Sequence, residues 1–419
     1  MPGPLLMEPR AQLNRRGTRR LLVAVAVLAL LIAAAVVQLA RGLDGVRAAV
    51  VLPRITVVPG RAVRMPWPAG ATAAVTVEGV AGLGGERANV VRPLASVTKL
   101  ITALVVLRQH PLAVGQSGPT IHFTDADATA YRRDLAQGQS VLKVSAGEQL
   151  TELQALEGML IPSADNIARI VARWSAGDSA AFVHDMNREA AALGLRHTHL
   201  VGPSGLDPGS VGTAADMVRV GGAVMANPVL RQIVAMRSVT LPVAGTVANY
   251  DSVLGQEGIV GIKTGSMSAA GGNFVFAAKH RVDARNVTII GAVLGAGGAE
   301  PLQTALDAAE QLVTAAVAEL HRVVLVPAGR RVLNISAGWY SRVPALTTRT
   351  ATLLAVPGQR LTMRVVTSPQ LTARKLHQIR PDEQLATVEI RYDGRTIELP
   401  VKGAAKLPPP SLLYRLTRL

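Results

Sequence analysis

Residues 21–40, LLVAVAVLALLIAAAVVQLA, contain no charged side chain. An apolar run of about 20 residues is long enough to cross a bilayer as one helix. The segment before it, residues 1–20, is basic and contains Arg10, Arg15, Arg16, Arg19 and Arg20. Arginines favour the cytoplasmic side, so we expect a single-pass protein of the cell membrane with its N-terminus in the cytoplasm and the remaining chain outside. A cleaved signal peptide is the alternative and would give a secreted protein, since Ala33 and Ala35 fit a cleavage site, but the run exceeds the usual length of a signal core.

The composition excludes several classes of function. The 419 residues are 49% hydrophobic, enough for two or three domains with an ample core. The formal net charge is +16, but aromatic residues are only 3% and the arginines are scattered, so we expect no nucleic-acid partner. The charge suits an anionic membrane or cell wall. The chain has no cysteine and no His-x-x-x-His or Glu-x-x-His pair, so we expect no metal and no cofactor.

The spacing of apolar residues divides the rest of the chain. Prolines and glycines in residues 41–70 predict a linker, and the alternation in residues 72–80 predicts a strand. Helical spacing follows at residues 92–107, 150–174 with a break at Pro162, 179–195, and 213–236 with a break at Asn227-Pro228. Consecutive strands are then predicted at residues 258–265, 273–280 and 286–295, followed by a helix at residues 301–321. This order predicts an α+β domain over residues 71–321, an antiparallel sheet covered by helices plus a helical subdomain.

The C-terminal part has a different character. Short alternating runs separated by Gly or Pro turns predict a small all-β domain over residues 322–405. It carries no cluster of potential catalytic groups. Residues 406–419 end in PPPSLLYRLTRL, and we expect a solvated tail there rather than a membrane-surface segment.

Ser96 and Lys99 lie near the start of the predicted helix, in RPLASVTKLITALVVL. Residues three apart on a helix share one face, so Lys99 is expected beside Ser96. A serine becomes a good nucleophile when a base takes its proton, and a lysine is a base only when burial or a second cation lowers its pKa. The helix beyond Lys99 is apolar on every side and supplies that burial. Taken alone, however, this short spacing also arises often by chance.

Two further segments carry groups of the same chemistry. Ser163 follows Pro162 in a predicted break between helices, which can aim its hydroxyl into a cleft, although a helix-capping serine would also fit. Lys263, Thr264 and Gly265 end a predicted strand, where Gly265 lets a substrate approach the backbone closely. Only seven of the 44 residues that are lysine or arginine are lysines, which indicates that this chain uses lysine at positions where arginine cannot replace it.

The order Ser96-x-x-Lys99, Ser163 to Asn166, Lys263-Thr264-Gly265 resembles the penicillin-recognising serine enzymes. Within them, strings such as ASVTKLITALVVL, MLIPSADNIA and GIKTGSMSAAGGNFVFAA resemble the D-alanyl-D-alanine carboxypeptidases, the low-molecular-mass penicillin-binding proteins. The similarity covers about residues 70–320, and the C-terminal β-rich part is similar to the accessory domain of that family only in kind.

The resemblance implies a role for each motif. Ser96 would attack the carbonyl between the two terminal D-alanines of a peptidoglycan stem peptide, with Lys99 as general base and Ser163 passing a proton to the departing D-alanine. Lys263 and Thr264 would bind the terminal carboxylate of the substrate, and the backbone N–H groups of Ser96 and Ser266 would form the oxyanion hole. Water would then hydrolyse the acyl-enzyme, and β-lactams would acylate the same serine as inhibitors.

The second motif departs from the family pattern. The family usually has Asn two residues after the motif serine, commonly followed by Asp, whereas this chain has Asp165 and then Asn166. A carboxylate facing the cleft would raise the pKa of Lys99 and weaken it as a base. We expect the loop to shift so that Asn166 faces inward as a catalytic residue. The alternatives are that Asp165 works at a different pH or that activity is reduced.

The sequence therefore predicts an exported serine D,D-carboxypeptidase. A D,D-endopeptidase or a transpeptidase stays possible, because the same acyl-enzyme can form from a cross-link or be attacked by an amine. A catalytically silent peptidoglycan-binding protein of the same fold is the alternative from another class. A β-lactamase would need an additional deacylating group, and no convincing glutamate lies in a suitable loop after Ser163.

Overall fold

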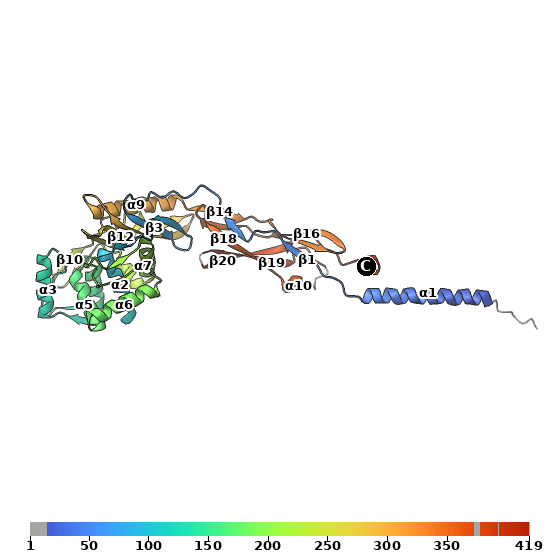
Figure 1. The fold of residues 1–419 in the computed structure, drawn as a ribbon, viewed down its shortest axis with the longest axis horizontal. Coiled ribbons are helices and arrows are strands. Elements are labelled where there is room, and N and C mark those ends of the chain that lie inside the picture. Colours follow the sequence, from blue (N-terminus) through green and yellow to red (C-terminus); the bar gives the residue numbers. More distant parts are fainter. Residues whose placement is uncertain (1–14, 373–377, 393, 419) are drawn as a thin grey trace, which may run out of the picture.

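The computed structural model describes residues 15–372, 378–392 and 394–418, which form three parts in a row (Figure 1). Helix α1 (Arg15–Ala40) extends away at one end, a β-rich domain lies in the middle, and a mixed α+β domain lies at the far end (Figure 1). Within α1, the stretch Gly17–Ala40 is long and apolar enough to cross a membrane, and no part of its most apolar window is buried by protein. Of the expected basic segment, residues 1–14 lie outside the described residues.

The far domain is built on a five-stranded antiparallel sheet in the order β11-β12-β13-β3-β4. The strands are β3 (Thr72–Val77), β4 (Ala81–Glu86), β11 (Ile259–Met267), β12 (Gly271–Val282) and β13 (Arg285–Ala296). The predicted meander of three consecutive strands is therefore confirmed.

The alternating direction of side chains along β12 explains how helices cover both faces of this sheet. Phe274 and Phe276 pack in one apolar cluster with α9 (Pro301–Ala318), while Val275 and Ala277 pack in another with α7 (Ala214–Ala226). Successive side chains of a strand point to opposite faces, so one apolar strand serves both layers. The predicted α+β architecture is confirmed.

A helical subdomain lies between β5 and β11. Its helices are α2 (Lys99–Gln109), α3 (Asp125–Ala136), α4 (Glu152–Leu160), α5 (Asp165–Ala176), α6 (Ser179–Ala192) and α8 (Pro228–Ile233), together with α7. The short elements are β5 (Arg92–Pro93), β6 (Thr120–His122), β7 (Gln149–Thr151), β8 (Val211–Gly212), β9 (Ser238–Leu241), β10 (Gly245–Ala248) and η2 (Gln256–Gly258). The predicted breaks between α4 and α5 and between α7 and α8 are both present.

The helix predicted over residues 92–107 begins later than expected. Arg92 and Pro93 form strand β5, which pairs with β8, and the N–H of Leu94 donates to the carbonyl of Ser210. A 3₁₀ turn, η1 (Ala95–Thr98), follows, and α2 starts only at Lys99. A helix through this region is prevented because Ala95 has a φ of +48° and the preceding residues are held by the strand pair.

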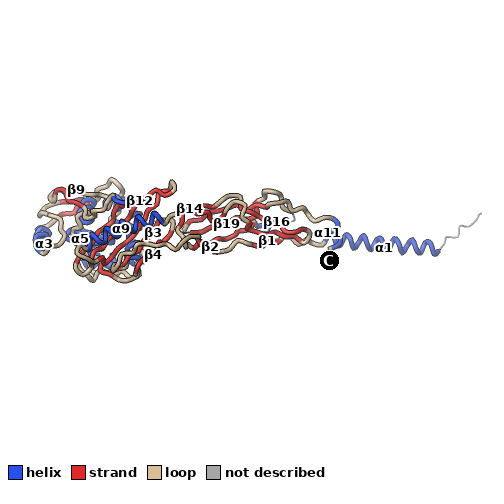
Figure 2. Tube along the Cα trace, turned by 90° about the horizontal axis from the view of Figure 1, so that it is seen from above, coloured by secondary structure: helices blue, strands red, loops and turns tan. Residues whose placement is uncertain are grey.

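The middle domain is made mostly of strands (Figure 2). Its largest sheet is seven-stranded and antiparallel, in the order β1-β15-β16-β20-β19-β18-β2. Its strands are β1 (Arg47–Val50), β2 (Ile55–Val57), β15 (Arg331–Ala337), β16 (Tyr340–Thr347), β18 (Arg360–Thr367), β19 (Gln384–Tyr392) and β20 (Arg395–Gly403). A separate pair, β14 (His321–Val326) and β17 (Ala351–Ala355), and helix α10 (Pro369–Thr372) complete the domain. The linker expected over residues 41–70 is wrong for residues 47–57, which supply both edge strands of the sheet.

The C-terminal end returns to the base of α1. Helix α11 (Leu412–Thr417) contacts α1, and the guanidinium of Arg415 donates to the carbonyl of Leu39 at 3.0 Å. Arg418 donates to the carbonyls of Gln38 at 3.2 Å and Arg41 at 2.6 Å. The expected solvated tail is therefore wrong here, because these arginines satisfy carbonyl groups that a helix end leaves without partners.

Candidate active site

The first motif lies at the junction of η1 and α2. Ser96 is half-buried in η1, and Lys99 is the first residue of α2 with no exposed surface. The amine of Lys99 donates to the hydroxyl of Ser96 at 2.8 Å, so the structure places the two side chains in contact, as the spacing predicted. The left-handed φ of Ala95, at +48°, is uncommon for a residue with a side chain and sharpens the turn that presents Ser96.

Two further oxygens surround the amine of Lys99. The carboxylate of Asp165 accepts from it at 2.6 Å, and the main-chain carbonyl of Ser204 accepts from it at 2.9 Å. Together with Ser96, these acceptors use all three N–H groups of a lysine ammonium. Sequence reasoning did not single out Ser204.

Asp165, and not Asn166, faces Lys99, so the expected inward orientation of Asn166 is wrong. The amide oxygen of Asn166 accepts from the N–H of Leu142 at 3.0 Å, and its amide nitrogen donates to the carbonyl of Leu142 at 2.8 Å. Helix α5 begins at Asp165, and successive residues of a helix point about 100° apart, so the two side chains cannot share one face. An amide also suits the Leu142 site because it both donates and accepts, which a carboxylate does not.

The surroundings of Lys99 act on its charge in both directions. Burial lowers the pKa of Lys99, and the nearby positive charge of Arg169 lowers it further. The charge and hydrogen bond of Asp165 raise that pKa without restoring its ordinary value. The amine therefore loses its proton more readily than an exposed lysine.

Ser163 lies in the break between α4 and α5. It is 4% exposed and has a φ of +62°, an arrangement that costs about 1–3 kcal/mol for a residue with a side chain and that the surrounding structure must impose. The N-cap of α5 is Ala164, without a side-chain cap, so the alternative that Ser163 is a capping serine is wrong. Asp165, two residues on, ties this segment to Lys99.

The third motif runs along the edge strand β11. Lys263 and Thr264 are 2% and 3% exposed, and the amine of Lys263 donates to the carbonyl of Thr264 at 3.0 Å. Burial lowers the pKa of Lys263 to about 7, and the positive charge of Lys99 contributes to that shift. The carboxylates of Asp165 and Asp251 act on the pKa of Lys263 in the opposite direction. The two lysines are therefore close enough for the charge of Lys99 to act on Lys263.

Gly265 brings β11 against the backbone of the nucleophile. A side-chain carbon at Gly265 would lie 3.0 Å from the backbone nitrogen of Ser96 and 3.1 Å from that of Val97, closer than ordinary contacts allow. A larger residue would force the two backbones apart, so glycine favours this close approach. The next residue, Ser266, is exposed and lies opposite Gly272 on β12. The structure thus brings the first and third motifs together.

Asn273 stabilises the contact between the first and third motifs, and the sequence analysis did not identify it. It lies on β12 opposite Gly265, has no exposed surface, and donates to the carbonyls of Pro93 at 3.0 Å and Leu94 at 2.9 Å. Its amide oxygen accepts from the N–H of Gly295 at 2.8 Å. The only signal in the sequence was an amide at the start of the apolar run NFVFAA.

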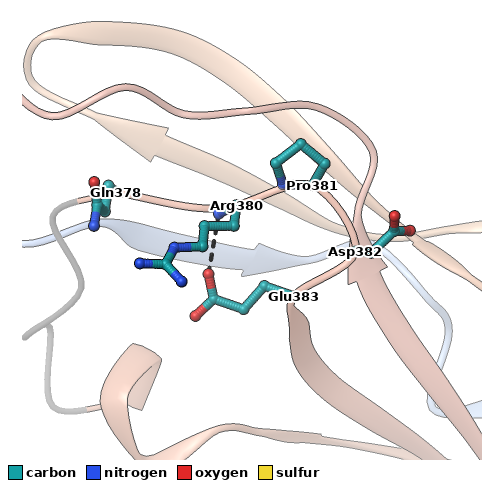
Figure 3. A pocket seen from close by; sticks show the side chains of 5 residues that line it. All are labelled: Gln378, Arg380, Pro381, Asp382 and Glu383. Carbon is teal, nitrogen blue, oxygen red and sulfur yellow. Dashed lines mark hydrogen bonds between the residues drawn. The ribbon is translucent and has the colours of Figure 1, made fainter.

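Other parts of the described chain offer less chemistry. Among the described residues, no group of three or more His, Asp or Glu side chains could hold a metal ion. A hollow of about 500 Å³ in the β-rich domain is lined by Gln378, Arg380, Pro381, Asp382 and Glu383 (Figure 3). There the N–H of Arg380 donates to the carboxylate of Glu383 at 3.0 Å, a local bond within the turn (Figure 3). The described residues that line this hollow include no nucleophile paired with a base.

A hydroxyl in contact with a buried amine, beside a Lys-Thr-Gly strand on an α+β domain, defines the class of penicillin-recognising serine enzymes. The family described as D-alanyl-D-alanine carboxypeptidase, peptidase family S11, matches residues 64–298, and the chain belongs to it.

Individual relatives agree with this family. The D-alanyl-D-alanine carboxypeptidase DacB2 of Mycobacterium tuberculosis is 36% identical over 203 residues, 47% of this chain and 65% of that relative. The chain thus spans slightly less than two thirds of the length of this relative. The Streptomyces K15 DD-transpeptidase structure matches with a TM-score of 0.55 and 25% identity, over 61% of this chain and 100% of that chain. The D-alanyl-D-alanine carboxypeptidase DacD of Francisella tularensis shares the fold over 84% of this chain and 96% of its own, with a TM-score of 0.56 and 18% identity.

Proposed function

We propose that this protein is a serine D,D-carboxypeptidase that removes the terminal D-alanine from peptidoglycan stem peptides. The observation that carries the proposal is the 2.8 Å hydrogen bond between the buried amine of Lys99 and the hydroxyl of Ser96. The family match and the carboxypeptidase name of the mycobacterial relative support the choice of substrate.

In this reaction the Ser96 oxygen attacks the carbonyl carbon of the penultimate D-alanine while Lys99 takes its proton. The oxyanion that forms accepts from the backbone N–H groups of Ser96 and Ser266. The bond to the terminal D-alanine then breaks, and Ser163 passes a proton to the departing amine. Water hydrolyses the ester on Ser96, and a β-lactam would acylate the same oxygen.

The third motif binds the substrate in this proposal. Lys263 and Thr264 hold the terminal carboxylate, and the backbone of Gly265 lies beside the reacting bond. Lys263 has a pKa of about 7, so a fraction of its amine is charged at neutral pH, and a bound carboxylate favours the charged form. Asn166 has no part in the chemistry and acts instead through its bonds to Leu142.

The proposed cellular location of the protein rests on helix α1. We infer that α1 stays attached as a membrane anchor, with the N-terminus in the cytoplasm and the peptidase domain outside, where peptidoglycan lies. The β-rich domain separates the peptidase domain from α1 and would hold the site away from the membrane (Figure 1).

One observation favours the catalytically silent alternative. The ion pair between Lys99 and Asp165, at 2.6 Å, stabilises the charged amine, which cannot take a proton from Ser96. A protein held in that state would bind stem peptides without cleaving them.

The test measures free D-alanine released from a pentapeptide ending in D-Ala-D-Ala by the full chain in detergent. We expect release that requires Ser96 and is lost in Ser96→Ala. A cross-linked stem-peptide dimer in a parallel reaction reports endopeptidase activity. Binding of the pentapeptide without release of D-alanine would contradict the enzyme proposal and support the silent alternative.

A further inference from the structure

The contacts of Lys99 create a chemical problem for the proposed reaction. Its amine donates to Ser96, Asp165 and the carbonyl of Ser204 at 2.8, 2.6 and 2.9 Å. In this arrangement every N–H bond is used and no lone pair points at Ser96. One proton must leave the amine before Lys99 can act as a base.

The surroundings limit where that proton can go. Lys99 has no exposed surface and Asp165 is 4% exposed, so the pair has almost no contact with bulk water. A main-chain carbonyl such as that of Ser204 is far too weak a base to keep a proton. Of the three groups in contact with the amine, the carboxylate of Asp165 is the one that can take it.

Other charged groups near the pair do not compete for this proton. Arg169 lies one turn further along α5 and is itself paired with the carboxylate of Asp134. Lys263 is the charged group on β11 that acts on the pair from the other motif. Asp251 interacts with Lys263, and its carboxylate accepts from the N–H of Val253 at 3.2 Å rather than from Lys99.

We propose that Asp165 receives a proton from Lys99 and thereby makes it a base, so that the two side chains work as one proton acceptor for Ser96. This inference rests on the proposed acylation of Ser96 and explains how an acid residue can occupy this position in an active enzyme. Asp165 acts through Lys99 and is a positioning residue rather than a group that touches the substrate.

A proton passes from the Lys99 amine to a carboxylate oxygen of Asp165, so one N–H bond breaks and one O–H bond forms, leaving a neutral amine beside a neutral acid. Rotation of the amine by a third of a turn aims its lone pair at Ser96. The Ser96 oxygen then attacks the substrate carbonyl while its proton moves to Lys99, which becomes charged beside protonated Asp165. The departing amine of the substrate removes one proton, and the pair returns to its starting state.

A purely electrostatic role of Asp165 predicts the opposite effect of mutation. A carboxylate that only stabilises charged Lys99 raises the pKa of that amine, so its removal would free the base and speed acylation at acid pH. If Asp165 receives the proton, removal of its carboxylate means that Lys99 must lose its proton without an acceptor beside it. Acylation at acid pH then slows. The sign of the change separates the two roles.

The experiment measures the second-order rate of acylation by a fluorescent penicillin from pH 5 to 7 for the full-length protein and Asp165→Asn. Asparagine keeps the size and one acceptor but cannot hold the proton. Lys263, whose pKa is about 7, begins to lose its charge at the upper end of this range, and Asp251, whose burial raises its pKa to about 6, titrates within it. Both groups are present in both proteins, so the comparison between the two holds them constant. The matched control is Asp127→Asn, which removes another buried carboxylate, one that pairs with Arg173 at 2.7 Å and does not contact Lys99.

We expect Asp165→Asn to slow acylation at pH 6 by roughly 100-fold, a typical size for the loss of one proton-transfer partner. Asp127→Asn should leave the shape of the pH profile unchanged. Equal or faster acylation by Asp165→Asn at pH 6 would overturn the inference while leaving the proposed function intact. Absence of acylation in the unmodified protein at every pH would instead contradict the proposed function.

The unmodified protein gives a second test should Asp165→Asn fail to fold. A pair that shares one proton keeps its working form across pH 5.5 to 7, so the rate should change less than about threefold. A tenfold rise per pH unit over this range would mean that Lys99 must first lose its proton to solvent, and this result would overturn the inference.

Discussion

Asn273→Ala tests whether one buried amide positions the nucleophile. The side chain makes three hydrogen bonds of 2.8 to 3.0 Å, two of them to the carbonyls of Pro93 and Leu94 directly before the Ser96 turn. At about 1 kcal/mol for each net bond, the substitution should cost about 3 kcal/mol of unfolding free energy. For a domain of this size the midpoint of thermal unfolding should fall by roughly 6–12 °C.

The same substitution should slow acylation more than lost stability explains. The bonds hold the chain that leads into η1, and a displacement of about 1 Å in a reacting group can cost on the order of 100-fold in rate. We expect acylation by penicillin to slow by about 10-fold or more at a temperature well below unfolding. Thermal unfolding and stopped-flow labelling of the same preparation give both numbers.

Asn187→Ala is the matched control. Asn187 on α6 also makes three bonds to main chain, to the carbonyls of Val183 at 3.0 Å and Leu200 at 2.8 Å and from the N–H of Leu200 at 3.1 Å. It should lower the unfolding midpoint, by a smaller amount because Asn187 is only half-buried, and keep acylation within about twofold. If both variants acylate equally fast, Asn273 has a structural role alone and the reasoning is refuted.

Three further outcomes follow from the site. Gly265→Ala should slow acylation because its side-chain carbon would press on the backbone nitrogen of Ser96 at 3.0 Å. Gly82→Ala, on strand β4 with open space around it, should not, and rates of penicillin labelling compare the two variants. The kcat/KM for a peptide with a free carboxylate should fall as pH rises above about 7, because Lys263 loses its proton there, and Lys263→Arg, which stays charged, should move this fall to higher pH. Incubation with a metal chelator should leave the release of D-alanine unchanged, since the proposed chemistry uses only side chains and main-chain N–H groups.

Local periodicity predicted the parts of the fold that have a strong pattern of their own. The apolar helix α1, the three strands of the meander and helix α9 are long and strongly apolar, so their type could be predicted from a single segment. The helix at Ser96 was misplaced because its start depends on the pairing of β5 with β8, more than 100 residues later in the chain.

Segments that depend on distant partners could not be predicted in this way. Strands β1 and β2 have four and three residues, and they pair with edges that β15 and β18 offer about 300 residues away in sequence. Helix α11 is similar, since its arginines find their acceptors at the end of α1. Six residues would not form a stable helix alone.

In the candidate site, too, local contacts could be predicted and contacts between distant segments could not. The contact between Ser96 and Lys99 follows from helical spacing, whereas the link to Lys263 came from resemblance to a family. The orientation of Asp165 depended on where α5 begins, and a one-residue difference decided between a carboxylate and an amide at the amine of Lys99. Ser204 contributes only a main-chain oxygen, which its residue type does not reveal.

The most direct test of the account is to treat the full-length protein with a penicillin, digest it and locate the adduct by mass spectrometry. The account predicts one penicilloyl group on Ser96, lost in Ser96→Ala and strongly reduced in Lys99→Ala. An unmodified Ser96 under conditions that label a known penicillin-binding protein, or an adduct at another serine, would contradict the claim that Lys99 makes this hydroxyl reactive.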